Sequence, residues 1–124
     1  MILGLGTDLV EPARLTERLR RNPTLRERLF AQAEVAYCEQ QADPAQHYAG
    51  RFAAKEALLK ALGCGLRGTL DLCDAAVAND ESGAPFFQLV GEVRQLVAER
   101  GATRIHLSIS HIPSAASAVV ILEA

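Results

Sequence analysis

Three short segments combine residue types that could bind a metal ion or an anion. In the first, Asp8 stands within the apolar residues 2–10 (ILGLGTDLV). An isolated ionised carboxylate is costly in a dry interior and needs a partner or a cation. Asp8 is therefore a candidate metal ligand. The alternative is a helix cap, because Asp8 and Glu11 have the spacing of a capping box, although such a box normally starts with Ser or Thr.

The second segment, residues 50–60 (GRFAAKEALLK), contains the only two lysines of the chain, Lys55 and Lys60. Glu56 and Lys60 have the i,i+4 spacing and the favourable order of a pair on one helix face. As a solvated ion pair they would contribute about 0.3–0.5 kcal/mol and carry no function. Alternatively, Arg51, Lys55 and Lys60 could together complement an anionic ligand.

The third segment is residues 108–111 (SISH), which ends in His111. A single histidine at the end of a strand is more often a hydrogen-bonded structural residue than a catalyst. The sequence has neither a serine-hydrolase elbow nor a zinc-binding spacing. Residues 63–68 match G-x-G-x-x-G, but they follow a predicted helix instead of a strand and so do not indicate a dinucleotide site. We interpret them as a helix end and a loop whose amides could face a phosphate.

Basic residues are concentrated in one stretch near the N-terminus. Two interpretations remain open: a solvated helix face, or a docking surface for an acidic partner. The arginines of this stretch are Arg14, Arg18, Arg20, Arg21, Arg26 and Arg28, opposed by Glu17 and Glu27.

Hydrophobic periodicity and turn residues predict the elements that must position these segments. The clearest is a helix from Pro44 to Leu62, with Asp43 as its N-cap and Gly63 as its end. No linker or repeat interrupts the chain, so we expect one α+β domain over residues 1–124. The other predicted elements are a strand over 2–10, a helix that opens at Glu11-Pro12 and is broken at Asn22-Pro23 into two pieces, a helix over 31–40, a hairpin of 73–79 with 85–89, a helix over 91–100 and a hairpin over 104–122.

Composition excludes several classes of protein. The chain has 124 residues, 49% of them hydrophobic, and a formal charge of −2, which disfavours bulk nucleic-acid binding. No apolar run approaches the roughly 20 residues of a membrane span, and the N-terminal residues lack the basic region of a signal peptide. Three cysteines without a C-x-x-C spacing indicate reduced thiols. We therefore expect a cytoplasmic protein.

Taken together and in this order, the segments resemble the holo-acyl-carrier-protein synthase family, the short bacterial-type class of the 4'-phosphopantetheinyl transferase superfamily. Residues 6–11 match its G-x-D-hydrophobic-hydrophobic-E signature, and residues 52–60 match F-x-x-K-E-A-x-x-K in full. Residues 108–111 match the looser S-hydrophobic-[ST]-H signature, and residues 83–85 match a G-x-P turn. The chain departs from the family at Ile112, where Thr is usual, and at Ala115 and Ala116, where an aromatic residue is usual.

The resemblance implies an activity and a set of site residues. Members of the family transfer the phosphopantetheine arm of coenzyme A to a serine of an apo-acyl carrier protein and release adenosine 3',5'-bisphosphate. By this resemblance Asp8 and Glu56 bind Mg²⁺, and Lys60 lies beside the same phosphates. Arg51 and His111 contact the phosphates of the nucleotide. The base is a metal-bound water, or Glu56 acting through one.

The resemblance also implies a fold and partners. It implies an antiparallel sheet with a long central helix, a homotrimer with interfacial active sites, and a role in fatty acid biosynthesis. Arg14, Arg18 and Arg21 would receive the acidic recognition helix of the carrier protein. The main rival is a non-catalytic module that binds an acidic protein or a nucleic acid through the arginines. A different Mg²⁺-dependent phosphotransferase lacks support, because no phosphate-binding P-loop is present.

Overall fold

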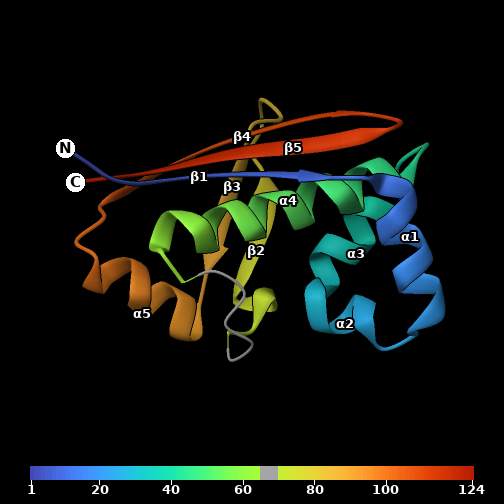
Figure 1. The fold of residues 1–124 in the computed structure, drawn as a ribbon, viewed down its shortest axis with the longest axis horizontal. Coiled ribbons are helices and arrows are strands. Elements are labelled where there is room, and N and C mark those ends of the chain that lie inside the picture. The colour runs from blue at the N-terminus through green and yellow to red at the C-terminus, as the bar shows by residue number, and fades with distance from the viewer. Residues whose placement is uncertain (65–69) are drawn as a thin grey trace.

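One long helix packs against a three-stranded antiparallel sheet, and a two-stranded hairpin and shorter helices surround it (Figure 1). The computed structural model describes residues 1–64 and 70–124. In chain order the elements are β1 (Ile2–Val10), α1 (Pro12–Arg21), α2 (Leu25–Leu29), α3 (Gln32–Glu39), α4 (Pro44–Leu62), the 3₁₀ turn η1 (Leu72–Asp74), β2 (Ala75–Asn79), β3 (Pro85–Leu89), α5 (Gly91–Glu99), β4 (Arg104–Ile112) and β5 (Ala115–Glu123).

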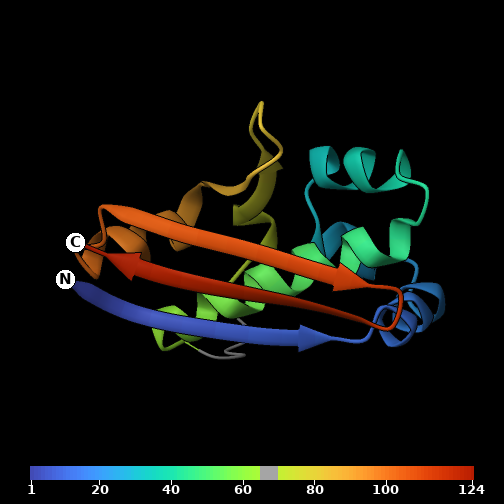
Figure 2. The same cartoon turned by 90° about the horizontal axis from the view of Figure 1, so that it is seen from above.

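The main sheet has the strand order β1-β5-β4, and Figure 2 shows the three long strands side by side. Strand β5 lies in the centre and pairs antiparallel with both neighbours. Its register places Asp8 of β1 opposite Ala118 and His111 of β4 opposite Ala116. Two residues of the sequence signatures therefore lie near the same end of this sheet, on strands on either side of β5.

Helix α4 approaches strand β1 closely because the facing residues are small. A Cβ added to Gly6 would collide with the carbonyl oxygen of Ala57, and one added to Gly4 would collide with that of Ala61. Only glycine leaves room for the helix backbone at these two positions. The close packing brings the segment that contains Asp8 against the C-terminal half of α4.

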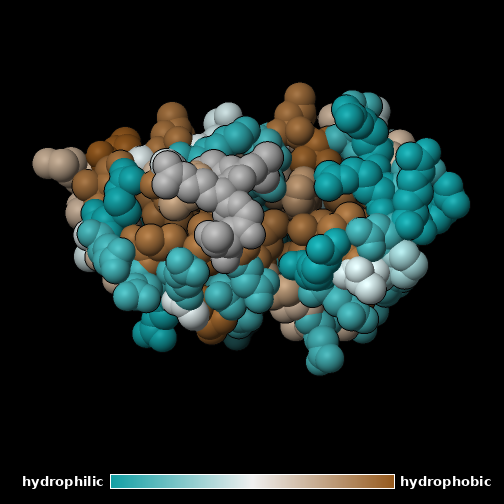
Figure 3. Space-filling view, turned by 60° about the horizontal axis from the view of Figure 1, so that its bottom comes forward, coloured by the Kyte–Doolittle hydropathy of each residue, from teal (hydrophilic) through white to brown (hydrophobic). Residues whose placement is uncertain are grey.

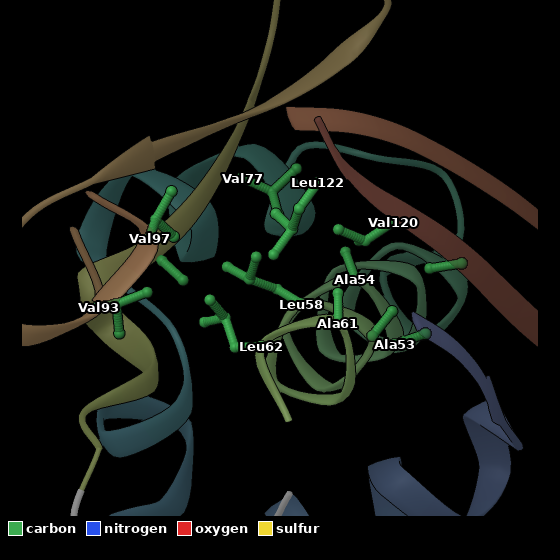
Figure 4. Packing of buried hydrophobic residues seen from close by; sticks show 13 residues of the cluster. Ala53, Ala54, Leu58, Ala61, Leu62, Val77, Val93, Val97, Val120 and Leu122 are labelled. Carbon is green, nitrogen blue, oxygen red and sulfur yellow. The ribbon is translucent and has the colours of Figure 1, made fainter. Parts of the chain in front are cut away.

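Two apolar clusters fix the helices around α4. In the larger one, Leu58 of α4 lies among side chains from α5 and β5, including Val93 and Leu122 (Figure 4). In the smaller one, Leu15 of α1 and Phe30 pack with other buried side chains near the N-terminal half of α4. The first cluster closes the core beneath the sheet, and the second attaches α1 to α3 at the other end of the molecule.

The structure confirms the predicted α+β class with a long central helix and both predicted hairpins. Gly63 ends α4 with a positive φ of 76°, as expected. One predicted boundary is wrong: the strand expected from residue 73 begins at Ala75, because the Asp71 carboxylate accepts the Cys73 N–H at 2.9 Å and starts η1. Asp43 is at the N-cap position of α4, as predicted, but it makes no side-chain cap hydrogen bond; its carboxylate accepts a bond from the Gln46 side chain at 2.7 Å.

Most of the glycine loop interpreted as a possible phosphate contact, residues 63–68, lies outside the described residues. Within the described ranges, no helix is long and apolar enough to cross a membrane.

Candidate active site

Asp8, Glu56 and Lys60 line one pocket with a volume of about 580 Å³. Asp8 is on the face of β1 that packs against α4, and Glu56 and Lys60 are on successive turns of that helix. The close approach of β1 to α4 therefore explains how residues far apart in the sequence meet. The structure brings together the carboxylates and the lysine that the signatures singled out.

Lys60 joins the helix to the strand. Its ammonium donates to Asp8 Oδ1 at 3.1 Å and to the Thr7 carbonyl at 3.0 Å. The solvated Glu56–Lys60 pair is therefore the wrong interpretation, because Lys60 forms its ion pair with Asp8. Helix capping by Asp8 is wrong as well, since Asp8 belongs to β1 and α1 begins at Pro12 after Glu11.

Glu56 is a buried carboxylate with a second carboxylate, Asp8, close by. It is only 7% exposed. Burial raises its pKa, and the neighbouring Asp8 raises the pKa further, while Lys60 and Arg18 oppose both effects. A cation between the two carboxylates would relieve this unfavourable charge.

The donor set fits magnesium. Mg²⁺ prefers oxygen ligands and commonly uses one or two carboxylates together with phosphate oxygens and water. In the described part of the chain, no group of three or more His, Cys, Asp or Glu side chains could hold a metal ion. Asp8 and Glu56 would therefore share such an ion with oxygen atoms of a ligand.

The arginine-rich stretch divides between two environments. Arg14 and Arg18 line the same pocket as the carboxylates. Arg21 instead donates to Glu17 at 3.0 Å, and Arg20 donates to the same carboxylate. Hydrophilic residues cover the end of the molecule where α1 and α2 lie (Figure 3). Arg14 and Arg18 thus form a basic rim on the carboxylate pocket.

Lys55 has a structural position, so the prediction that it complements an anionic ligand is wrong. Its side chain is completely buried and pairs with Glu34 at 2.5 Å. The ammonium also donates to the carbonyls of Leu29 and Leu72, at 2.7 and 2.9 Å. Glu34 accepts the Val77 N–H at 2.9 Å as well, so this pair fastens α3 and the hairpin to α4.

Arg51 and His111 meet in a second pocket of about 190 Å³. Arg51 donates to Asn79 Oδ1 at 2.8 Å and stacks over the Tyr37 ring at 3.9 Å. Its Nε is buried and has no hydrogen-bond partner in the structure. His111 Nδ1 lies 2.7 Å from Gln46 Oε1. His111 also lines the pocket, so its hydrogen bond to Gln46 does not exclude a ligand contact.

None of the residues lining this second pocket lines the carboxylate pocket. Sequence reasoning did not find Tyr37, His47 and Asn79, which complete the pocket around Arg51. They come from α3, α4 and β2, and each lies outside the sequence signatures. No local pattern in the sequence could have joined them.

The fold and these pockets define a class: an α+β domain with a carboxylate pair and a lysine on a long helix, and with a separate cationic pocket. A family model for the 4'-phosphopantetheinyl transferase superfamily matches residues 4–117. The chain belongs to this superfamily of enzymes, which confirms the resemblance seen in the signatures.

Named relatives are similar over the whole chain. Holo-[acyl-carrier-protein] synthase of Trichlorobacter lovleyi is 50% identical, covering 100% of this chain and 99% of the relative. The enzyme of the same name from Treponema denticola is 49% identical, covering 99% of each.

Solved structures of enzymes with this name have a similar fold. The holo-[acyl-carrier-protein] synthase of Neisseria meningitidis matches with a TM-score of 0.90 at 31% identity, covering 100% of both chains. The Helicobacter pylori enzyme, solved in complex with coenzyme A, matches with a TM-score of 0.82 at 28% identity, covering 96% of this chain and 99% of that one.

Proposed function

We propose that this protein transfers the 4'-phosphopantetheine arm of coenzyme A to a serine hydroxyl of an apo-acyl carrier protein. The observation that carries the proposal is the meeting of Asp8, Glu56 and Lys60 in one open pocket. The names of its relatives and the coenzyme A complex of the Helicobacter pylori enzyme support it.

In this reaction the serine oxygen attacks the phosphorus that bears the pantetheine arm. An O–P bond forms, the bond to the other phosphate of the pyrophosphate breaks, and adenosine 3',5'-bisphosphate leaves. Mg²⁺ held by Asp8 and Glu56 would neutralise charge on the pyrophosphate. Lys60, exposed at the mouth of the same pocket, stabilises the departing phosphate. Glu56, acting through a water molecule, is our candidate base for the serine proton, since its carboxylate lines the pocket in which the serine would lie.

The second pocket suits the nucleotide of coenzyme A. Arg51 has an unpartnered buried Nε and is already oriented by Asn79 and Tyr37. A guanidinium held in this way binds phosphate without a large loss of side-chain entropy. We therefore assign the phosphates of the nucleotide to Arg51 and His111.

We assign the acidic helix of the carrier protein to the basic rim. Arg14 and Arg18 line the carboxylate pocket, so a carrier bound there would present its serine to Asp8 and Glu56. Arg21 lies one turn further along α1 and would extend the contact after exchanging Glu17 for a carrier carboxylate. Charge complementarity of this kind governs orientation and association rate.

We also propose a homotrimer with active sites between subunits. The outer face of the main sheet exposes large apolar side chains, with Leu5 61%, Leu9 72% and Ile112 58% exposed. Contiguous apolar patches on a protein surface mark interaction sites. In such an assembly the nucleotide pocket of one subunit could adjoin the carboxylate pocket of another. Free cysteines Cys38, Cys64 and Cys73 support our assignment to the cytoplasm. The names of the relatives, which act on acyl carrier proteins, support our assignment to fatty acid biosynthesis.

The test is intact-mass spectrometry of an apo-acyl carrier protein incubated with this protein and coenzyme A, with and without Mg²⁺. We expect a gain of one phosphopantetheinyl group only when Mg²⁺ is present. No gain with several apo-carriers, for protein shown by circular dichroism to be folded, would overturn the proposal and favour the non-catalytic binding module.

A further inference from the structure

His47 occupies a position in the second pocket that no family signature marks. It lies on the first turns of α4, four positions before Arg51, and lines the same pocket as Arg51 and His111. Its ring lies edge-on between two others, with centroid distances of 4.8 Å to His111 and 5.7 Å to Tyr37. Packing therefore fixes the imidazole within the pocket.

Basic side chains line this second pocket, and no acidic side chain among its described lining residues neutralises them. Arg51 is permanently charged, His47 and His111 can each be charged, and none of the described residues lining the pocket is acidic. Such a pocket attracts an anion and resists double protonation while it is empty.

The groups that face His47 come from three directions. They are His111 from β4, Tyr37 from α3, and Arg51 with Asp43 from α4 and its start. Burial lowers the pKa of His47, and His111 and Arg51 lower the pKa further; only Asp43 opposes them. The Asp43 carboxylate is engaged with Gln46. The neutral form of His47 is therefore favoured when no anion is bound.

His111 complements this arrangement. The Gln46 amide nitrogen donates to Asp43, so Gln46 Oε1 accepts the hydrogen of His111 Nδ1 and the Nε2 of His111 is the acceptor nitrogen. An entering phosphate dianion would offset the repulsion between His47 and Arg51 and would favour the charged form of His47.

We propose that His47 is a third phosphate-binding cation of this pocket, beside Arg51 and His111, and that it takes up a proton when the phosphate group of the ligand enters. The inference rests on the proposed function only in taking the nucleotide of coenzyme A as the ligand. Its consequence is specific: nucleotide binding by this chain is coupled to proton uptake and weakens as the pH rises.

The test is calorimetric titration with adenosine 3',5'-bisphosphate at about pH 7.5 in two non-phosphate buffers of different ionisation enthalpy, which counts the protons taken up. The variant His47→Phe keeps an aromatic ring against Tyr37 and His111 but cannot be protonated. We expect the variant to take up fewer protons and to bind the nucleotide about fivefold more weakly at about pH 6, the size typical of a partly exposed ion pair. At about pH 8.5 the two proteins should bind alike.

A second measurement uses the unchanged protein and guards against misfolding of the variant. The chain has three histidines, so their imidazole signals can be resolved by NMR. Adenosine 3',5'-bisphosphate should raise the pKa of His47, shift the signals of His47 and His111, and leave those of His106 in place. His106 is the internal control because it lies on the outer face of β4, paired with Glu123 at 2.9 Å.

The outcomes separate the two proposals. Nucleotide binding with equal proton uptake in both proteins, and an unmoved pKa of His47, would overturn the role of His47 while the transfer assay still supports the transferase. A wild-type protein that binds neither adenosine 3',5'-bisphosphate nor coenzyme A, and transfers nothing, would overturn both.

Discussion

The Lys60 ammonium lies 3.1 Å from the Asp8 carboxylate and so spans the contact between helix α4 and strand β1. Glu56, one helical turn before Lys60, faces the same pocket and is almost completely buried. Two carboxylates and one ammonium thus line one pocket, in which Asp8 raises the pKa of Glu56 and Lys60 lowers it. The roles of these groups, and of the residues that hold them in place, can each be tested by substitution.

Glu56→Gln should abolish phosphopantetheinyl transfer, because the amide keeps the shape of the side chain but removes the charge proposed to bind Mg²⁺. The intact mass of the carrier protein measures transfer, and circular dichroism checks the fold. Glu99→Gln, an exposed change on α5, is the matched control and should retain activity. Normal transfer by Glu56→Gln at ordinary Mg²⁺ would remove Glu56 from the metal site.

Reversing charge on the basic rim should impair carrier recognition more than coenzyme A binding. We expect Arg14→Glu and Arg18→Glu to raise KM for the carrier about tenfold, and Arg21→Glu to have a smaller effect because Arg21 already pairs with Glu17. Arg94→Glu on α5 is the control for net charge. A loss confined to coenzyme A affinity would show that α1 is not the docking surface.

Gly6→Ala should destabilise the protein by several kcal/mol and reduce transfer, because the new methyl group would collide with the Ala57 carbonyl and force β1 away from α4. Urea unfolding gives the free energy of unfolding. Thr7→Ala, at the neighbouring exposed position, should change it by less than about 0.5 kcal/mol. Equal stabilities for the two variants would contradict the close approach of helix and strand.

Lys55→Met should lower the free energy of unfolding by about 3–5 kcal/mol, because it leaves the Glu34 carboxylate buried without its charged partner. Chemical denaturation measures the loss. The double variant Lys55→Met with Glu34→Gln should recover part of it, since no unpaired charge remains. A loss of less than about 1 kcal/mol in the free energy of unfolding would show that the buried Lys55–Glu34 pair does not stabilise the fold.

His47→Phe should make stability less sensitive to acid. Burial and neighbouring cations hold the pKa of His47 below its usual value, so the unfolded chain takes up this proton first as the pH falls below about 6.5. The wild type loses stability in that range, while above it His47 is neutral in both states and contributes nothing. Thermal midpoints at about pH 7 and pH 5 measure the difference; identical decreases in the two proteins would refute the prediction.

The elements and the carboxylate site could be predicted because their signals are local. Hydrophobic periodicity and Gly63 defined α4, and the spacing of Glu56 and Lys60 on one helix placed them together. The partner of Lys60 could not be predicted, because Asp8 reaches it only through the packing of β1 against Ala57. Lys55 was misassigned for the same reason: its type and spacing suit an anion site, and only the tertiary fold reveals that Glu34 lies against it.

The pairing of β1 with β5 has a consequence for how the protein is made. Asp8 belongs to β1, which among the described strands pairs with β5 alone, where Ala118 lies opposite Asp8 from far along the sequence. While the nascent chain emerges from the ribosome, β1 therefore has an unpaired edge, and pairings between such distant segments form slowly. The metal-binding half of the site and the closure of the sheet should arise in the same late step, so an incomplete chain would have no preformed catalytic centre.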